Sequence, residues 1–257
     1  MHAAAFRALK VDAIYSPFEV PPADLKPILD ALMLAGVEGL NVTVPLKQRV
    51  MAFCDRIDPA ARAIGAVNTL VIRNRRISGF NTDAPGFLKA IEELGWHSKP
   101  AHVIVLGAGG AARAVVWALS GIRGVQITVA NRHLARAKQL AREARLWHAG
   151  ACIQTASLNR IPLHDADWLI NATTVGMQAR DPAPIALTGL RKQTRVYDLI
   201  YHRETRLVKE SRRRGCVASC GLSMLLYQGA ESFRLWTKRR PPVAVMQRAL
   251  QKAVGLN

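Results

Sequence analysis

The feature that most constrains this chain is a continuous apolar run that leads directly into a glycine cluster. Ala101–Leu106 is apolar apart from His102, and Gly107-Ala108-Gly109-Gly110-Ala111-Ala112 follows at once. A helical pattern then runs from about Gly110 to Leu119. Apolar runs of this kind are typical of buried parallel strands, and glycines between a strand and a helix mark a tight connection. The segment therefore predicts a strand–turn–helix unit.

The glycine cluster fits the pattern G-x-G-x-x-A of dinucleotide-binding turns. Gly107 permits the tight turn, Gly109 lets the backbone approach a pyrophosphate, and Ala112 allows close contact between helix and sheet. Gly110 and Ala111 open the helix, whose N-terminal N–H groups carry partial positive charge that suits phosphate. A glycine-rich turn without a ligand is the alternative.

Strand and helix patterns continue to alternate beyond this turn. Val125–Ala130 is a second apolar strand and Leu134–Arg145 a second helix. Strand–helix–strand order predicts a doubly wound α/β domain with a parallel sheet. Three further short strands are expected at Trp168–Asn171, Arg195–Ile200 and Cys216–Ser219.

The residues after the second strand bear on the choice of dinucleotide. An NAD-binding domain ends this strand with a carboxylate that binds the ribose hydroxyls. Here Asn131 and Arg132 stand at that place, with Arg136 one helical turn further on. Two guanidinium groups suit a 2′-phosphate, so we expect NADP rather than NAD. The competing interpretation assigns both arginines to a generally basic surface, because 36 Lys and Arg against 18 Asp and Glu give a net charge of +18.

The first third of the chain mixes helices and short extended runs, and two helices close the chain. We expect helices at Ala3–Leu9, Pro22–Leu34, Ser223–Thr237 and Pro242–Val254, and extended segments at Asp12–Val20, Gly39–Val44, Val67–Ile72 and Arg76–Phe80, the last two joined by a turn at Asn74.

Three polar clusters stand beside glycines or at strand ends in this first third. They are Asn41–Lys47, Gly65–Thr69 and Gly79–Asp83. Each alone is ordinary turn chemistry, since Asn, Thr and Asp are common turn residues. Strand alternation places Thr43 on the face opposite Val42 and Val44. All three clusters ahead of a dinucleotide fold indicate the polyol-binding half of a dehydrogenase.

Seven ordered motifs make the chain similar to a known family, the shikimate dehydrogenases. They cover nearly the whole chain: NVTVPLK at 41–47, GAVNT at 65–69, NTD at 81–83, GAGGAA at 107–112, NRxxxR at 131–136, NATTVGM at 171–177 and GLSMLLYQ at 221–228. The resemblance implies NADPH-dependent reduction of 3-dehydroshikimate to shikimate in aromatic amino-acid biosynthesis. It also implies a cytoplasmic enzyme of two domains, acting as a monomer or a homodimer.

The resemblance assigns roles to individual residues. Lys47 and Asp83 are the implied catalytic pair, which fits the need for a proton donor where a ketone gains alkoxide character. Thr43, Asn68, Asp83 and Gln228 are implied to hold substrate hydroxyls, and Tyr201 to lie near the ring carboxylate. The implied cofactor-binding residues are Gly107, Gly109, Gly110, Ala111, Ala112, Asn131, Arg132, Arg136, Thr173, Gly221 and Met224.

Two domains are expected on this basis. Residues 1–83 with 222–257 form the α/β substrate domain, and residues 84–221 form the Rossmann-type NADP-binding domain. Ala84 and Ser223 depart from the family's usual glycines, and the segment after Tyr201 is one residue shorter than usual. The family's first strand and its SxSP turn, whose serines hold the substrate carboxylate, have no counterpart here. We expect a start at a downstream methionine, with a truncated, catalytically weakened NADP-binding paralogue as the alternative.

Several other classes are disfavoured by composition. The four cysteines are too scattered for a disulfide scaffold, and Cys216 and Cys220 lack a second ligand pair for zinc. The N-terminus shows no signal peptide, and Val103–Ile122 contains too many glycines and Arg113 to span a membrane. A nucleic-acid-binding protein is the remote alternative, suggested by Arg212–Arg214 and Lys238–Arg240 but supported by no binding motif. Discrimination between shikimate and quinate depends on pocket shape.

Overall fold

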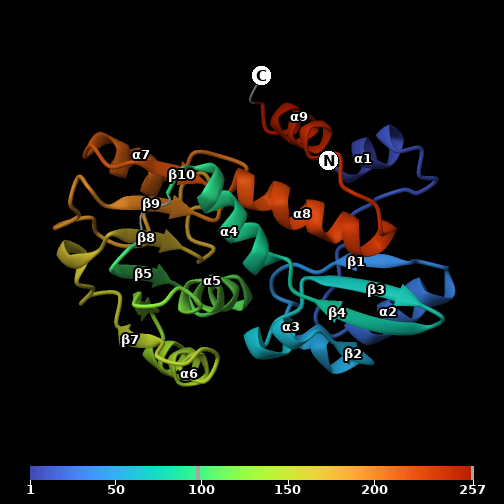
Figure 1. Ribbon diagram of the computed structural model, residues 1–257, viewed down its shortest axis with the longest axis horizontal. Helices are drawn as coiled ribbons and strands as arrows, with labels where there is room; N and C mark the ends of the chain where they lie inside the picture. Colours follow the sequence, from blue (N-terminus) through green and yellow to red (C-terminus); the bar gives the residue numbers. More distant parts are fainter. Residues whose placement is uncertain (97–98, 256–257) are drawn as a thin grey trace. The chain divides into compact units, whose positions relative to one another are not determined.

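A computed structural model describes residues 1–96 and 99–255 of the chain (Figure 1). The chain divides into two compact units, Met1–Gly86 with Leu226–Asn257 and Phe87–Leu225. Their boundaries lie a few residues beyond the expected ones, inside α4 (Asp83–Glu93) and α8 (Leu222–Thr237). Each unit is described below by itself.

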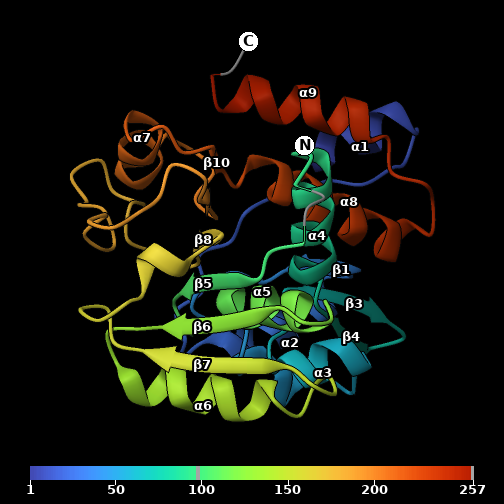
Figure 2. The ribbon, with the colours of Figure 1, turned by 60° about the vertical axis from the view of Figure 1, so that its left-hand side comes forward.

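The second unit is built on a six-stranded sheet in which every neighbouring pair is parallel. The order β7-β6-β5-β8-β9-β10 is that of a dinucleotide-binding sheet, and it reverses between β5 and β8. Figure 2 shows β5, β6 and β7 side by side. The strands are β5 (His102–Leu106), β6 (Gln126–Ala130), β7 (Cys152–Ala156), β8 (Trp168–Asn171), β9 (Arg195–Asp198) and β10 (Ala218–Cys220).

Helices α5 (Gly110–Ser120), α6 (Leu134–Ala144) and α7 (Arg206–Arg213) complete this unit, with a 3-10 turn at Leu163–Asp165. All five residues of β5 are buried, as expected for a central strand covered on both faces. Ile104, Leu106, Leu169 and Val196 belong to one apolar cluster of the unit. The expected α/β fold is thus confirmed.

The first unit contains a four-stranded sheet in the order β1-β3-β4-β2. A tight hairpin joins β3 (Thr69–Arg73) to β4 (Arg76–Phe80) through Asn74 and Arg75, whose φ angles are 52° and 57°. Antiparallel pairing places Thr69 opposite Phe80, so residues just before β3 meet residues just after β4. The other elements are α1 (His2–Ala8), α2 (Leu25–Leu34), β1 (Gly39–Asn41), the 3-10 helix Arg49–Phe53, β2 (Arg56–Ile57), α3 (Pro59–Ile64) and α9 (Val243–Ala253).

Two expected strands differ from the structure. Asp12–Val20 is not part of any strand among the described residues, and side chains such as Ile14 are exposed (91%) rather than packed on a sheet face. The strand expected over Gly39–Val44 ends at Asn41, and the Val44–Pro45 peptide bond is cis. Period-two alternation therefore stops before Thr43. Val42 is buried, whereas Thr43 and Val44 are both exposed.

Over residues 1–96 and 99–255, no helix combines the length and the apolar character that crossing a lipid bilayer requires. The same residues bring no three His, Cys, Asp or Glu side chains together in a way that could hold a metal ion.

Candidate active site and cofactor site

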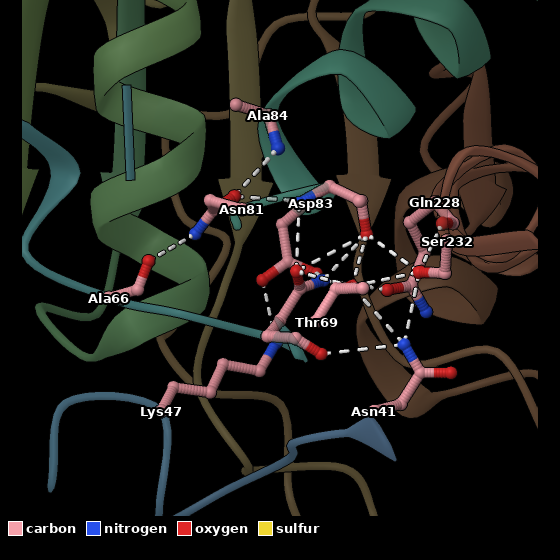
Figure 3. A network of polar contacts seen from close by, with 11 residues as sticks. Asn41, Lys47, Ala66, Thr69, Asn81, Asp83, Ala84, Gln228 and Ser232 are labelled. Carbon is pink, nitrogen blue, oxygen red and sulfur yellow. Dashed lines mark hydrogen bonds and ion pairs between the residues drawn. The ribbon is translucent and has the colours of Figure 1, made fainter. Parts of the chain in front are cut away.

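A buried ion pair lies at the centre of the polar cluster in the first unit (Figure 3). Lys47 Nζ is 2.6 Å from Asp83 Oδ2, and the two side chains are only 12% and 4% exposed. Lys47 lies two residues after Pro45, and Asp83 is the first residue of α4. Burying two charges is costly unless they are paired and hydrogen-bonded, so such pairs frequently mark functional sites.

Asn81 fixes the start of the helix that carries Asp83. Its Oδ1 accepts the backbone N–H groups of Asp83 (3.1 Å) and Ala84 (3.2 Å), and its Nδ2 donates to the backbone oxygen of Ala66 (2.9 Å). Side-chain acceptors at a helix start satisfy N–H groups that have no intrahelical partner. The partial positive charge of the same helix end favours the Asp83 carboxylate.

Asn68 links the ion pair to α8. Its Oδ1 accepts the backbone N–H of Thr82 at 2.7 Å, so its Nδ2 faces the opposite way. Nδ2 lies 2.9 Å from Asp83 Oδ1 and 2.9 Å from Gln228 Oε1, both of which can only accept. Four expected site residues, Lys47, Asn68, Asp83 and Gln228, therefore lie together in one unit.

The two other expected substrate residues, Thr43 and Tyr201, are both exposed. Among the described residues, the exposed side chain of Thr43 has no hydrogen bond; its backbone oxygen accepts the N–H of Leu46 at 2.8 Å. Tyr201 belongs to the second unit, is 41% exposed, and its ring lies nearly perpendicular to that of His202, with 5.7 Å between the ring centroids.

Three hydroxyl groups near the Asn68 amide were given no role from the sequence. Thr69, Thr82 and Ser232 are buried, and their oxygens lie 2.8–3.3 Å from one another. Thr69 and Thr82 belong to the GAVNT and NTD motifs, so the sequence placed them near the site without giving them a role. Ser232 and its contact with Asn41 carried no such signal.

In the second unit the turn between β5 and α5 fits a phosphate group. Gly107 has φ +112°, and a Cβ there would come within 2.9 Å of the Ala172 oxygen. A Cβ on Gly109 would instead meet nothing within 4 Å. Gly109 caps α5 without a side-chain hydrogen bond, so the N–H groups of Gly110, Ala111 and Ala112 remain for an anion.

Two arginines follow β6 at the expected positions. Arg132 and Arg136 are exposed, and no carboxylate lies within ion-pair distance of either in the part of the chain that the structure describes. Asn131 donates to the backbone oxygen of His133 at 3.3 Å, which tightens the turn before α6. The arginines are thus available for a phosphate group.

The loop after β8 is held by a buried amide and carboxyl. Asn171 Oδ1 accepts from both Thr173 N (3.1 Å) and Thr173 Oγ1 (2.7 Å), while its Nδ2 donates to Asp198 Oδ1 (3.0 Å). Burial raises the pKa of Asp198 above its ordinary value. A Cβ on Gly107 would lie 3.4 Å from Thr173, so Thr173 stands beside the glycine turn.

The last two expected cofactor residues lie around the start of α8. A side chain at Gly221 would collide with the Leu199 oxygen, 2.3 Å from an added Cβ, which explains the glycine. Met224 is buried, and the neighbouring Ser223 Oγ lies 3.4 Å from the hydroxyl of Tyr197. Burial raises the pKa of Tyr197 to about 12.

Comparison with known proteins agrees with this arrangement. Residues 1–70 match the family described as the shikimate dehydrogenase substrate binding domain, residues 89–179 match shikimate / quinate 5-dehydrogenase, and residues 221–251 match the shikimate 5′-dehydrogenase C-terminal domain. The shikimate dehydrogenase (NADP⁺) of Moorella thermoacetica is 42% identical over 264 residues, covering 99% of this chain and 88% of that protein. The chain belongs to the shikimate dehydrogenase family.

Solved structures of the family include enzymes of two kinds. The shikimate 5-dehydrogenase of Thermus thermophilus, in complex with NADP(H) and shikimate, matches with a TM-score of 0.86 and 36% identity, covering 98% of this chain and 92% of that one. The quinate dehydrogenase of Corynebacterium glutamicum, in complex with NAD, matches with a TM-score of 0.89 and 32% identity, covering 98% and 92%. The NADP⁺-dependent relative and the structure with NADP(H) agree with the expected NADP, and the residues after β6 bear on the same choice.

Proposed function

We propose that this protein catalyses the reversible, NADPH-dependent reduction of 3-dehydroshikimate to shikimate. The observation that carries the proposal is the buried Lys47–Asp83 pair, held by Asn68 and Gln228 in a chain that also has a glycine turn suited to phosphate. The residues assigned to the substrate belong to the first unit except Tyr201, and the residues assigned to NADP belong to the second unit.

The chain's own residues supply binding and proton transfer. When bound, NADPH supplies the hydride that reduces the ketone. Lys47 holds a proton on Nζ for the oxygen that gains negative charge, and Asp83 Oδ2 orients that ammonium group. Asn68 and Gln228 present amide groups to the ring hydroxyls, joined by Thr43, and Tyr201 is assigned to the carboxylate.

NADP is favoured over NAD by the two arginines after β6. A carboxylate at the end of this strand would bind ribose hydroxyls and repel a 2′-phosphate. The chain has Asn131 and Arg132 there, with Arg136 following, so the local charge is positive. Planar guanidinium groups bind phosphate through paired hydrogen bonds.

Steady-state oxidation of shikimate and of quinate, each with NADP⁺ and NAD⁺, tests the proposal. We expect the highest kcat/KM with shikimate and NADP⁺. Arg132→Gln should raise the KM for NADP⁺ roughly ten- to hundredfold, as expected for a lost charge-assisted hydrogen bond, and leave that for NAD⁺ unchanged. Arg142→Gln, the same change at an exposed arginine within α6, is the control.

Three outcomes would contradict parts of the proposal. Equal losses with both cofactors would mean that Arg132 does not read the 2′-phosphate. A higher kcat/KM for quinate than for shikimate would mean that the protein is a quinate dehydrogenase. NADP⁺ binding without turnover of either substrate would support a weakened paralogue.

A further inference from the structure

A hydrogen-bonded series of polar side chains leads from Tyr15, at the surface of the first unit, to the amide oxygen of Asn68. Ser232, on α8, lies in the middle of it and is completely buried. Its Oγ is 3.0 Å from Asn41 Nδ2 and 2.8 Å from Thr69 Oγ1. Figure 3 shows Ser232 beside Gln228, with Asn41 and Thr69 facing it.

The donors in this hydrogen-bonded series can be assigned by starting from Tyr15 at the surface. Tyr15 Oη donates to Asn41 Oδ1 at 3.0 Å, so Asn41 Nδ2 points the other way and donates to Ser232 Oγ. Ser232 must then place its own proton on another acceptor. Three acceptors lie in reach of this hydroxyl: Thr69 Oγ1 at 2.8 Å, the backbone oxygen of Gln228 at 3.0 Å and Thr82 Oγ1 at 3.3 Å. We assign the proton to Thr69 Oγ1, which makes the shortest of the three contacts.

A proton from Ser232 leaves the Thr69 hydroxyl to donate onward. Thr69 Oγ1 is 3.1 Å from Asn68 Oδ1, which also accepts the backbone N–H of Thr82. The Thr82 hydroxyl, at 3.2 Å, is a third donor to this oxygen. Together these donors hold the Asn68 amide in one orientation, with Nδ2 toward Asp83 and Gln228. The reversed amide would direct an oxygen at the Asp83 carboxylate.

We propose that Ser232 is a positioning residue for the reaction. Through Thr69 it fixes the orientation of the Asn68 amide, and Asn68 in turn holds Asp83 against Lys47 and Gln228 in place for the substrate. The inference rests on the proposed function, because Asn68, Asp83 and Gln228 have their roles from it. Ser232 is completely buried, its oxygen contacts only protein atoms of Asn41, Thr69, Thr82 and Gln228 among the described residues, and its proposed effect passes through these neighbours.

Ser232→Ala removes one oxygen and tests the proposal. We expect kcat/KM for shikimate to fall about three- to tenfold, the range that one lost neutral hydrogen bond supplies. The KM for NADP⁺ should stay unchanged, because the cofactor residues belong to the other unit. Ser211→Ala is the matched control, since Ser211 is equally buried and its hydroxyl has no partner among the described residues.

A double-mutant cycle with Thr69→Val separates positioning from general packing. If Ser232 acts through the Thr69 hydroxyl, Ser232→Ala should cost nothing further in the Thr69→Val protein. Equal fold losses in both backgrounds would overturn the inference, as would full activity of the single variant. Tyr15→Phe offers a second variant in which only a hydroxyl is lost. Tyr15 is 43% exposed and begins the hydrogen-bonded series, so we expect a smaller fall in kcat/KM for shikimate.

The two proposals fail in different ways. If the unmodified protein oxidises neither shikimate nor quinate, the proposed function fails and the inference falls with it. If the unmodified protein is active and Ser232→Ala matches Ser211→Ala in every kinetic constant, the inference alone is wrong.

Discussion

Replacing Lys47 by methionine separates the two contributions that the buried ion pair makes. At 2.6 Å, the gross attraction between Lys47 and Asp83 is about 6 kcal/mol with an effective dielectric constant near 20. Desolvation offsets much of this attraction, yet removing one partner leaves a buried charge without its counterion and costs about 3–5 kcal/mol. Asp83 keeps its bond from Asn68, so we expect the lower end, about 3 kcal/mol.

Such a loss lowers the thermal midpoint by roughly 6–12 °C, at about 2–4 °C per kcal/mol for a chain of this size. The effect on catalysis should be larger, because a proton donor contributes about 10²–10⁴-fold to the rate. We expect kcat to fall by that factor with a small change in KM, since the interaction is formed mainly in the transition state.

The assay is steady-state oxidation of shikimate with NADP⁺, together with a thermal melt of the same preparation. Lys26→Met is the matched control, because Lys26 forms an ion pair with Asp30 of similar length (2.5 Å) whose partners are 56% and 44% exposed. Exposed pairs contribute about 0–1 kcal/mol, so this variant should keep its activity and its melting point. A Lys47→Met protein that keeps more than about one tenth of the kcat would refute the assignment of Lys47 as proton donor.

Three further changes test other parts of the structure. Gly109→Ala should leave the thermal midpoint of the cofactor-free protein unchanged, since the added methyl meets nothing within 4 Å, but should weaken NADP⁺ binding in calorimetry by blocking the approach of the pyrophosphate. Asn81→Ala should destabilise the protein by about 1–2 kcal/mol in urea unfolding, because two N–H groups of α4 lose their acceptor. Burial lowers the pKa of His2 from 6.5 to about 4. The unfolded chain therefore takes up a proton as the pH falls from 6.5 to 4 while the folded chain does not, and stability should fall by up to about 3 kcal/mol in that interval, less so in His2→Phe.

The sequence predicted the second unit well because its signals are local. Unbroken apolar runs and a glycine turn mark β5 and α5, and the expected strand Trp168–Asn171 matches β8. Elements without such signals were missed. β7 is an edge strand in which only Ile153 is buried, and α7 is mostly charged, so neither shows an apolar run. Helix α4 was also missed, because Pro85 and Gly86, two residues that are unfavourable in most helix positions, lie in its first turn.

The candidate site could be predicted only in part, because its members are far apart in the chain. Lys47 and Asp83 are separated by 36 positions, and Asn68 and Gln228 by 160. No periodicity connects residues at such separations, so these assignments came from a resemblance between motifs. Ser232 belongs to none of the residues that the motifs single out, and only its burial and its contacts with Asn41 and Thr69 reveal it.

The turn that joins β3 and β4 helps to set the geometry of the candidate site at the other end of the hairpin. Insertions at exposed loop tips are usually tolerated. Here a two-residue turn, Asn74-Arg75, determines which residues of the two strands face each other, and the far end of the same ladder aligns Asn68 with Thr82. A single inserted residue would move one strand against the other by about 3.4 Å and reverse its side chains. The length of this turn therefore helps to set the geometry of the site, although the turn carries none of its chemistry.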